Sequence, residues 1–160
     1  MDMPSRPGAG GADPAMGVAS VIEAAGGPPP GIAFPQGLPG FPAATRFALL
    51  PLGEAAEGLL ILQSQDDPYL RFLVLPYRED EMALRRVDLD SACELLGVPK
   101  EHAAFLLVVT RQPAADGDEA RQFFVNLRAP VVVDTARRTA VQHVLASQGY
   151  SVRHPLAVAA

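Results

Sequence analysis

Residues 60–76 read LILQSQDDPYLRFLVLP, a stretch in which two short apolar runs flank a polar centre. The first run, Leu59–Leu62, follows Gly58, and the second, Phe72–Leu75, ends at Pro76. Each run is too short for a helix and has the length and boundaries of a strand. The stretch therefore predicts two strands that are joined by its polar centre.

The polar centre ends in Asp66-Asp67-Pro68, and these residues predict a turn. Proline favours extended backbone in the residue before it, and Asp side chains accept hydrogen bonds from nearby backbone N–H groups. Whether the two carboxylates also form a binding site depends on the rest of the chain.

The composition indicates one acidic domain with a hydrophobic core. The chain has 160 residues, 49% of them hydrophobic, and 13 Lys and Arg stand against 18 Asp and Glu for a net charge of −5. An acidic chain without a Lys/Arg cluster is a poor candidate for direct nucleic-acid binding and a better partner for a basic protein. Cys93 is the single cysteine, which excludes an intrachain disulfide and a cysteine metal cluster.

Residues 1–30 are dense in Gly, Pro and Ala, a composition that predicts a disordered tail. The tail lacks the basic region and apolar run of a signal peptide, and no apolar stretch in the chain approaches the roughly 20 residues of a membrane helix. We therefore expect a cytoplasmic protein that does not interact with a membrane, with its folded domain over residues 31–157.

Short apolar runs between Gly- and Pro-rich turns predict a mainly β domain, a small barrel or sandwich. The run Ala103–Val109 is the most hydrophobic and is expected to be a central strand with both faces covered. The other expected strands cover residues 32–34, 47–52, 59–62, 72–75, 82–87, 123–127, 131–133, 139–145 and 150–156.

One short helix is predicted over residues 89–96, because Leu89, Ala92, Cys93 and Leu96 fall on one face. Gly97 is expected to end it, and Asp88 or Asp90 to cap its start. Cys93 then lies on the apolar side of the helix, as a buried structural thiol does.

The sequence contains no pattern that predicts catalysis, and we expect no catalytic, cofactor-binding or metal-binding residue. His102, His143 and His154 are widely separated and fit no metal-ligand spacing. No phosphate-binding loop, dinucleotide-binding motif or nucleophile elbow is present. Arg137-Arg138 fits a solvated turn better than a phosphate contact.

Four motifs follow one another along the domain: FPQGLPGF at 34–41, LQS with DDP at 62–68, VNL with AP at 125–130, and YSVRHPL at 150–156. Each motif alone is a loop or strand pattern. In this order the chain resembles the flagellar assembly factor FliW family, over about residues 32–156.

The resemblance implies a small antiparallel β-barrel-like fold with one short α-helix, and a non-enzymatic role in the cytoplasm. Proteins of this family bind flagellin before its secretion. They also bind the RNA-binding translational regulator CsrA and relieve its repression of flagellin mRNA. Flagellin and CsrA compete, so the resemblance implies a protein partner switch.

An acidic surface beside the basic RNA-binding groove of CsrA would repel phosphate and steer the encounter. We expect that surface among the acidic residues Asp66, Asp67, Glu79, Asp80, Glu81, Asp116, Asp118 and Glu119. Four polar residues in or beside apolar strands have two interpretations, an internal hydrogen-bond network or contact with the partner. These four are Gln63, Asn126, Arg153 and His154.

Two alternatives stay open at this point. Arg71 after the DDP motif and the Gly/Pro-rich tail, which is not a family feature, favour a diverged member. Gln36 and Ala140 are further departures, at positions where the family usually has Glu and Gly. A diverged member binds only one of these partners or works with the regulator. A different class, a small-molecule-binding barrel or a minor hydrolase using His154 or Cys93, requires a deep pocket with a convergent His, Cys and carboxylate.

Overall fold

A computed structural model describes residues 31–52, 58–79, 82–113, 121–147 and 149–156. The predicted tail 1–30, the acidic residues Asp80 and Glu81, and the acidic loop 116–119 lie outside these described residues. In chain order the elements are β1 (Gly31–Ala33), β2 (Arg46–Pro51), β3 (Leu60–Ser64), β4 (Arg71–Pro76), α2 (Arg86–Leu96), the 3-10 helix η2 (Lys100–His102), β5 (Ala103–Pro113), β6 (Arg121–Val125), β7 (Val131–Asp134), β8 (Thr139–Gln142) and β9 (His154–Leu156).

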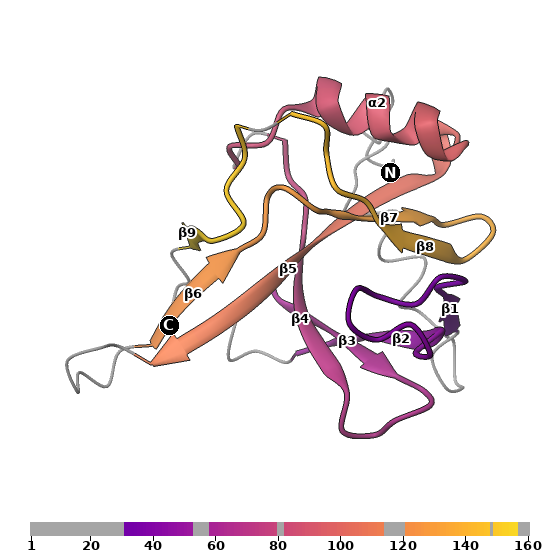
Figure 1. The fold of residues 1–160 in the computed structure, drawn as a ribbon, viewed down its shortest axis with the longest axis vertical. Coiled ribbons are helices and arrows are strands. Elements are labelled where there is room, and N and C mark those ends of the chain that lie inside the picture. Colours follow the sequence, from indigo (N-terminus) through magenta and orange to yellow (C-terminus); the bar gives the residue numbers. More distant parts are fainter. Residues whose placement is uncertain (1–30, 53–57, 80–81, 114–120, 148, 157–160) are drawn as a thin grey trace, which may run out of the picture.

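The strands form one sheet that closes on itself. Its order is β4-β3-β2-β1-β8-β7-β5, and β4 also pairs with β5, which closes these seven strands into a barrel. The long strand β5 pairs with β7 near its start, with β4 in its middle and with β6 near its end. β6 and β9 continue outward from the barrel along the end of β5 (Figure 1). The predicted mainly β, barrel-like fold is confirmed.

Alternation along β5 divides the core into two layers. Ala104 and Leu106 belong to the cluster that fills the barrel, with Phe47, Leu62 and residues of the other barrel strands. Side chains of successive strand residues point to opposite faces, so Ala103, Phe105, Leu107 and Val109 pack outside the barrel. Residues 103–109 of β5 are thus covered on both faces, as the sequence predicts.

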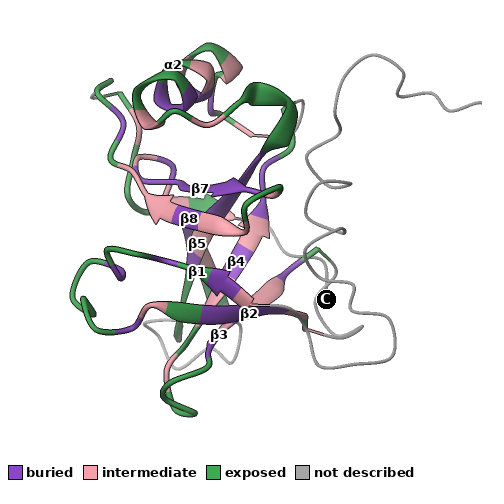
Figure 2. Cartoon of the chain, turned by 90° about the vertical axis from the view of Figure 1, so that its right-hand side faces the viewer, coloured by how far each residue is buried: buried purple, intermediate pink, exposed green. Residues whose placement is uncertain are grey.

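Helix α2 lies across the outer face of the barrel and covers this second layer (Figures 1 and 2). Its buried residues Leu89, Ala92 and Cys93 are those predicted to share a face. Gly97 ends the helix in the left-handed conformation, with φ of 74°, also as predicted. Among the described residues, no helix is long and apolar enough to cross a lipid bilayer.

The predicted strand over residues 82–87 is wrong. Tyr77 at the end of β4 donates its hydroxyl to the carbonyl oxygen of Leu84 at 2.8 Å, and Leu84 is buried in the outer layer. Residues 82–85 therefore form a loop. The helix begins at Arg86, three residues before the predicted start at Leu89.

The predicted cap of this helix is also wrong. The N-cap residue is Arg85, and its side chain makes no capping hydrogen bond. Asp90 instead pairs with Arg86 one turn away at 3.0 Å, a surface contact that the (i, i+4) spacing allows. Asp88 accepts a hydrogen bond from Tyr150, far along the chain.

Two predicted strands are shorter in the structure. The strand predicted over 139–145 ends at Gln142, and that predicted over 150–156 begins at His154. Between them, backbone groups of His143, Leu145 and Ser151 bond to the corner at residues 127–130, and the side-chain hydroxyl of Tyr150 reaches the start of α2.

Candidate partner-binding surface

The turn between β3 and β4 is held by side chains of its own sequence. Ser64 Oγ accepts hydrogen bonds from the backbone N–H groups of Asp66, at 3.1 Å, and Asp67, at 3.0 Å. Asp67 Oδ1 accepts one from the N–H of Tyr69 at 2.9 Å. Such side-chain bonds stabilise a turn from within its own sequence. The turn predicted at Asp66-Asp67-Pro68 is confirmed.

Gln63 lies in β3 and its side chain braces the same turn. Its Nε2 lies 3.2 Å from the carbonyl oxygen of Leu70, 3.2 Å from that of Ser64 and 3.3 Å from that of Pro68. An amide NH₂ group has two hydrogens, so it serves two of these acceptors at a time. The function of Gln63 in the described structure is therefore local.

The loop after β1 packs beside this turn. Leu38 and Phe41 exchange two backbone hydrogen bonds, of 3.2 and 2.7 Å. The ring of Phe41 meets that of Phe72 edge-on, with centroids 5.7 Å apart. Loop and turn share a groove of about 360 Å³, lined by Gly40, Phe41, Pro42, Ala43, Ala44, Ser64, Asp66, Asp67 and Leu70. The first two motifs of the sequence thus form one surface.

This surface, defined as Phe41, Asp66, Asp67 and Tyr69 and called the turn surface below, presents acidic and aromatic groups to solvent. Tyr69 is 93% exposed, Phe41 is 42% exposed, and both carboxylates are exposed. Within the described residues neither Asp takes part in a salt bridge. Arg71 at the start of β4 is also exposed, so one positive charge lies behind the acidic tip. Exposed Tyr beside charge is typical of protein-binding surfaces.

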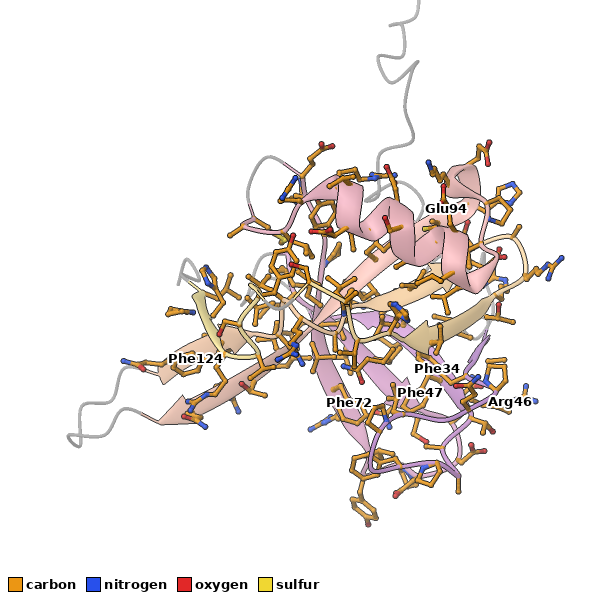
Figure 3. All side chains as sticks on the ribbon, turned by 45° about the horizontal axis from the view of Figure 1, so that its top comes forward. Phe34, Arg46, Phe47, Phe72, Glu94 and Phe124 are labelled. Atoms are coloured by element: carbon orange, nitrogen blue, oxygen red, sulfur yellow. The ribbon has the colours of Figure 1, made fainter. Side chains whose placement is uncertain are left out.

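The last two motifs meet elsewhere, where β6 pairs with β9. Val125 of β6 stands opposite His154 of β9, and the N–H of Leu127 donates to the carbonyl oxygen of Ser151 at 3.0 Å. The aromatic side chains show the separation, because Phe124 of β6 lies far from the cluster of rings around Phe72 (Figure 3).

Asn126 shapes the corner that follows β6. Its Oδ1 accepts hydrogen bonds from the N–H groups of Arg128, at 3.0 Å, and Ala129, at 3.1 Å. Its own N–H donates to Val108 of β5 at 2.9 Å. Like Gln63, it holds a local turn.

Arg153 lies on the surface of this β6–β9 region. Its Nη2 donates to Gln112 Oε1 at 2.6 Å, and its guanidinium group lies 4.5 Å from the centroid of the Phe124 ring. His154 beside it is half-buried. The idea that Gln63, Asn126, Arg153 and His154 share one network is therefore wrong, because they occupy separate local settings. Their contact with a partner stays a prediction.

Those of the predicted acidic residues that the structure describes do not form a single patch. Glu79 is exposed, but it follows the end of β4 that is remote from the turn. A strand of six residues is about 20 Å long, so Glu79 lies about that far from Asp66 and Asp67. The structure brings the two Asp residues together with Phe41 and Tyr69 rather than with Glu79.

The groups needed for a catalytic site are not brought together in the described residues. Cys93 is buried in α2, and burial together with nearby Asp90 raises the pKa of its thiol. His154 lies on β9 instead. No group of three His, Cys, Asp or Glu side chains in the described part of the chain could hold a metal ion.

The comparison with protein families decides what kind of domain carries this surface. The family model described as "FliW protein" matches residues 19–156. This chain belongs to the FliW family. Two relatives, each named "Flagellar assembly factor FliW", cover 78% of the chain. The relative from Heliobacterium modesticaldum is 31% identical over 126 residues, with 78% of its length covered, and that from Shouchella clausii is 33% identical over 133 residues, with 82% covered.

A solved FliW structure has the same fold. The crystal structure of the flagellar assembly factor FliW superposes with a TM-score of 0.58 at 28% sequence identity. The match covers 78% of this chain and 84% of the other. In this chain the four motifs used for the resemblance lie in pairs, one pair at the turn surface and one at β6 and β9.

Sequence reasoning missed three residues that form or hold the turn surface. Tyr69 and Phe41 were not expected at a binding surface, although a large aromatic residue directly after Asp-Asp-Pro was a usable signal. Ser64 was not expected to hold the turn, yet a Ser two residues before the first Asp fits a side-chain-capped turn.

Proposed function

We propose that this FliW family member binds flagellin in the cytoplasm and also binds the translational regulator CsrA, antagonising its repression of flagellin mRNA. Family membership supports a role in flagellar assembly. The assignment of flagellin and CsrA as its partners rests on the motif resemblance and on the chemistry of the turn surface. In this proposal the chain acts as a non-enzymatic partner switch.

The observation that carries the proposal is the braced turn with exposed Asp66, Asp67 and Tyr69. A surface that is rigid before binding loses little conformational entropy on association, so its contacts contribute more to affinity. Tyr is a frequent anchor at interfaces, and two adjacent carboxylates attract a basic partner and repel RNA phosphate. These properties fit an antagonist of an RNA-binding protein.

The alternative of a hydrolase finds no support in the described residues, since Cys93 is buried and His154 is on another element. The diverged member that binds a single partner is the remaining candidate. Exposed Arg71 beside the acidic tip favours it, because a positive charge there weakens attraction to a basic regulator.

The experiment is calorimetric titration of the full chain with CsrA and, separately, with flagellin, followed by competition between them. We expect binding to both, with one displacing the other. Binding to flagellin alone would support the diverged member, and binding to neither would overturn the proposal.

A matched variant separates charge from turn shape. Asp66→Asn with Asp67→Asn removes both charges and keeps an oxygen that accepts from the Tyr69 N–H. We expect about tenfold weaker CsrA binding at low salt and a flatter salt dependence. Glu101→Gln on η2, an exposed acid on another element, serves as the control with unchanged binding. Equal affinities for both variants would remove the turn surface from the interface.

A further inference from the structure

The groove between the loop after β1 and the β3–β4 turn, called the turn groove below, combines apolar walls with an acidic rim. Ser64, Asp66 and Asp67 are the polar residues of its lining, and its apolar residues are Gly40, Phe41, Pro42, Ala43, Ala44 and Leu70. Among the described residues, no Lys, Arg or His lines it. Its volume of about 360 Å³ is near the lower end of the roughly 300–1,000 Å³ of ligand pockets. Such a size suits one long side chain better than a helix or a strand.

The apolar walls of the turn groove are held by contacts within the fold. Leu70 and Phe72 pack against the cluster that fills the barrel, and the ring of Phe41 meets that of Phe72 edge-on. Ala44 is buried, and its N–H donates to the carbonyl oxygen of Phe41 at 3.1 Å. The loop and the turn therefore offer a supported apolar surface to the methylene groups of a ligand.

The two carboxylates at the rim have no cation beside them in the part of the chain that the structure describes. Neither Asp66 nor Asp67 forms a salt bridge there. Asp67 Oδ1 accepts a hydrogen bond from the Tyr69 N–H at 2.9 Å, which orients this carboxylate. Phe72 faces the barrel cluster, so Arg71, the residue before it in β4, points to the opposite face of the strand. The rim therefore carries negative charge that a ligand can neutralise.

An arginine side chain has the two parts that this lining requires. Its aliphatic stem can cover the apolar walls, and its planar guanidinium group stacks on aromatic rings and binds carboxylates through paired N–H donors. Phe41, which is 42% exposed and lines the groove beside the carboxylates, supplies such a ring. Lysine has a similar stem, but its ammonium group is more strongly hydrated and has no plane to stack.

We propose that the turn groove binds one arginine side chain of a basic protein partner. The stem lies against Phe41, Ala43 and Leu70, and the guanidinium group pairs with Asp66 and Asp67 at the rim. The same carboxylates repel an anionic ligand, so the groove distinguishes a basic protein from a nucleic acid. That this partner is CsrA rests on the proposed function, whereas the binding of arginine rests on the lining of the groove.

The test uses three short peptides as probes: acetyl-Gly-Arg-Gly-amide and the same peptide with citrulline or lysine in place of arginine. Each is titrated into the full chain while NMR follows the backbone amides of Ala44, Asp67 and Leu70. We expect saturable shifts with the arginine peptide, with a dissociation constant on the order of millimolar. Citrulline has nearly the same shape without the charge, so its peptide should bind at least about tenfold more weakly. The lysine peptide should bind about threefold more weakly.

Two variants with a matched control locate the binding. Ala43→Leu fills the groove and keeps both carboxylates, so we expect at least about fivefold weaker binding of the arginine peptide. Ala136→Leu, at an exposed alanine in the turn between β7 and β8, should bind it as the unmodified chain does. Asp66→Asn removes one charge from the rim and should weaken the arginine peptide but not the citrulline peptide. Unchanged amide signals in the barrel strands verify that each variant is folded.

Three results would overturn the proposal. The first is equal binding of the arginine and citrulline peptides, and the second is undiminished binding in Ala43→Leu. The third is a lysine peptide that binds as tightly as the arginine peptide, which would refute the selection of arginine. Since the probes contain no part of CsrA or flagellin, a chain that binds CsrA but not the arginine peptide refutes this inference alone. A chain that binds the arginine peptide but neither protein refutes the proposed function alone.

Discussion

The β3–β4 turn and the corner where Tyr150 meets α2 are held in opposite ways. In the turn, every side-chain bond that braces the backbone joins residues no more than seven positions apart, the longest from Gln63 to Leu70. At the corner, the hydroxyl of Tyr150 donates to the carboxylate of Asp88, 62 positions away, and accepts from the N–H of Arg85, 65 positions away, at 3.1 Å. The side-chain bonds of the turn come only from its own sequence, whereas those of the corner need the completed fold.

Under the proposed function, this difference separates partner binding from stability. The turn surface can vary in charge while its backbone bonds persist, as the proposed partner switch requires. The corner ties the C-terminal segment to the start of the only α-helix in the described residues, so changes there should act on the whole domain.

The largest expected effect concerns the loop that supports the turn. Gly37 has φ of 69°, and a Cβ there would lie 2.6 Å from the backbone of Phe41 and Pro42. Gly37→Ala should therefore destabilise the domain by about 3 kcal/mol, from left-handed strain and from overlap with backbone that cannot move freely. Urea denaturation measures the loss.

Gly40→Ala in the same loop is the matched control. Gly40 also has a positive φ, of 87°, but an added Cβ would meet no atom within 4 Å. Its loss should be about 1 kcal/mol, from strain alone. Equal losses in the two variants would show that Gly37 is required only for its positive φ. The closeness of the Phe41 and Pro42 backbone would then add nothing to the loss.

The corner should be more sensitive than the turn surface to the same chemical change. Tyr150→Phe removes both hydrogen bonds of the hydroxyl and leaves the N–H of the helix cap residue Arg85 without this acceptor. We expect a loss of about 1–2 kcal/mol in the free energy of unfolding. Tyr69→Phe, at a side chain 93% exposed, should leave stability within about 0.5 kcal/mol. Equal free energies of unfolding in the two variants would show that the hydrogen bonds of Tyr150 do not stabilise the domain more than the exposed hydroxyl of Tyr69 does.

Within the turn, the bracing bonds themselves should contribute a smaller, local effect. Ser64→Ala removes the acceptor of the Asp66 and Asp67 N–H groups, so we expect a loss of about 1 kcal/mol and faster exchange of these two amides. Ser147 is exposed, and Ser147→Ala supplies the control because it should change neither the free energy of unfolding nor the exchange of the Asp66 and Asp67 amides. Unchanged amide exchange in Ser64→Ala would mean that Ser64 does not hold the turn.

The same contrast explains how much the sequence could predict. The β3–β4 pair, the apolar face of α2 and its end at Gly97 depend on spacing within about ten residues, and all were predicted. The start of α2 was not, because the group that meets the Arg85 N–H is Tyr150. Likewise the distance between Glu79 and the two Asp residues of the turn is set by the length of β4, which a list of acidic residues does not reveal.

The smallest expected effect is a change in pH dependence at the corner. Burial, and then the hydrogen bond to Asp88, raise the pKa of Tyr150. A group with a raised pKa in the folded state stabilises the fold below its unfolded pKa, about 10 for a phenol, and this stability is lost as the pH rises through the folded value. The free energy of unfolding should therefore fall more steeply above about pH 10 in the unmodified chain than in Tyr150→Phe. Urea denaturation of both proteins from pH 7 to 11 measures this difference in slope. Because both proteins contain Cys93, its contribution cancels in the difference. Parallel curves of the free energy of unfolding over the whole range would contradict the prediction.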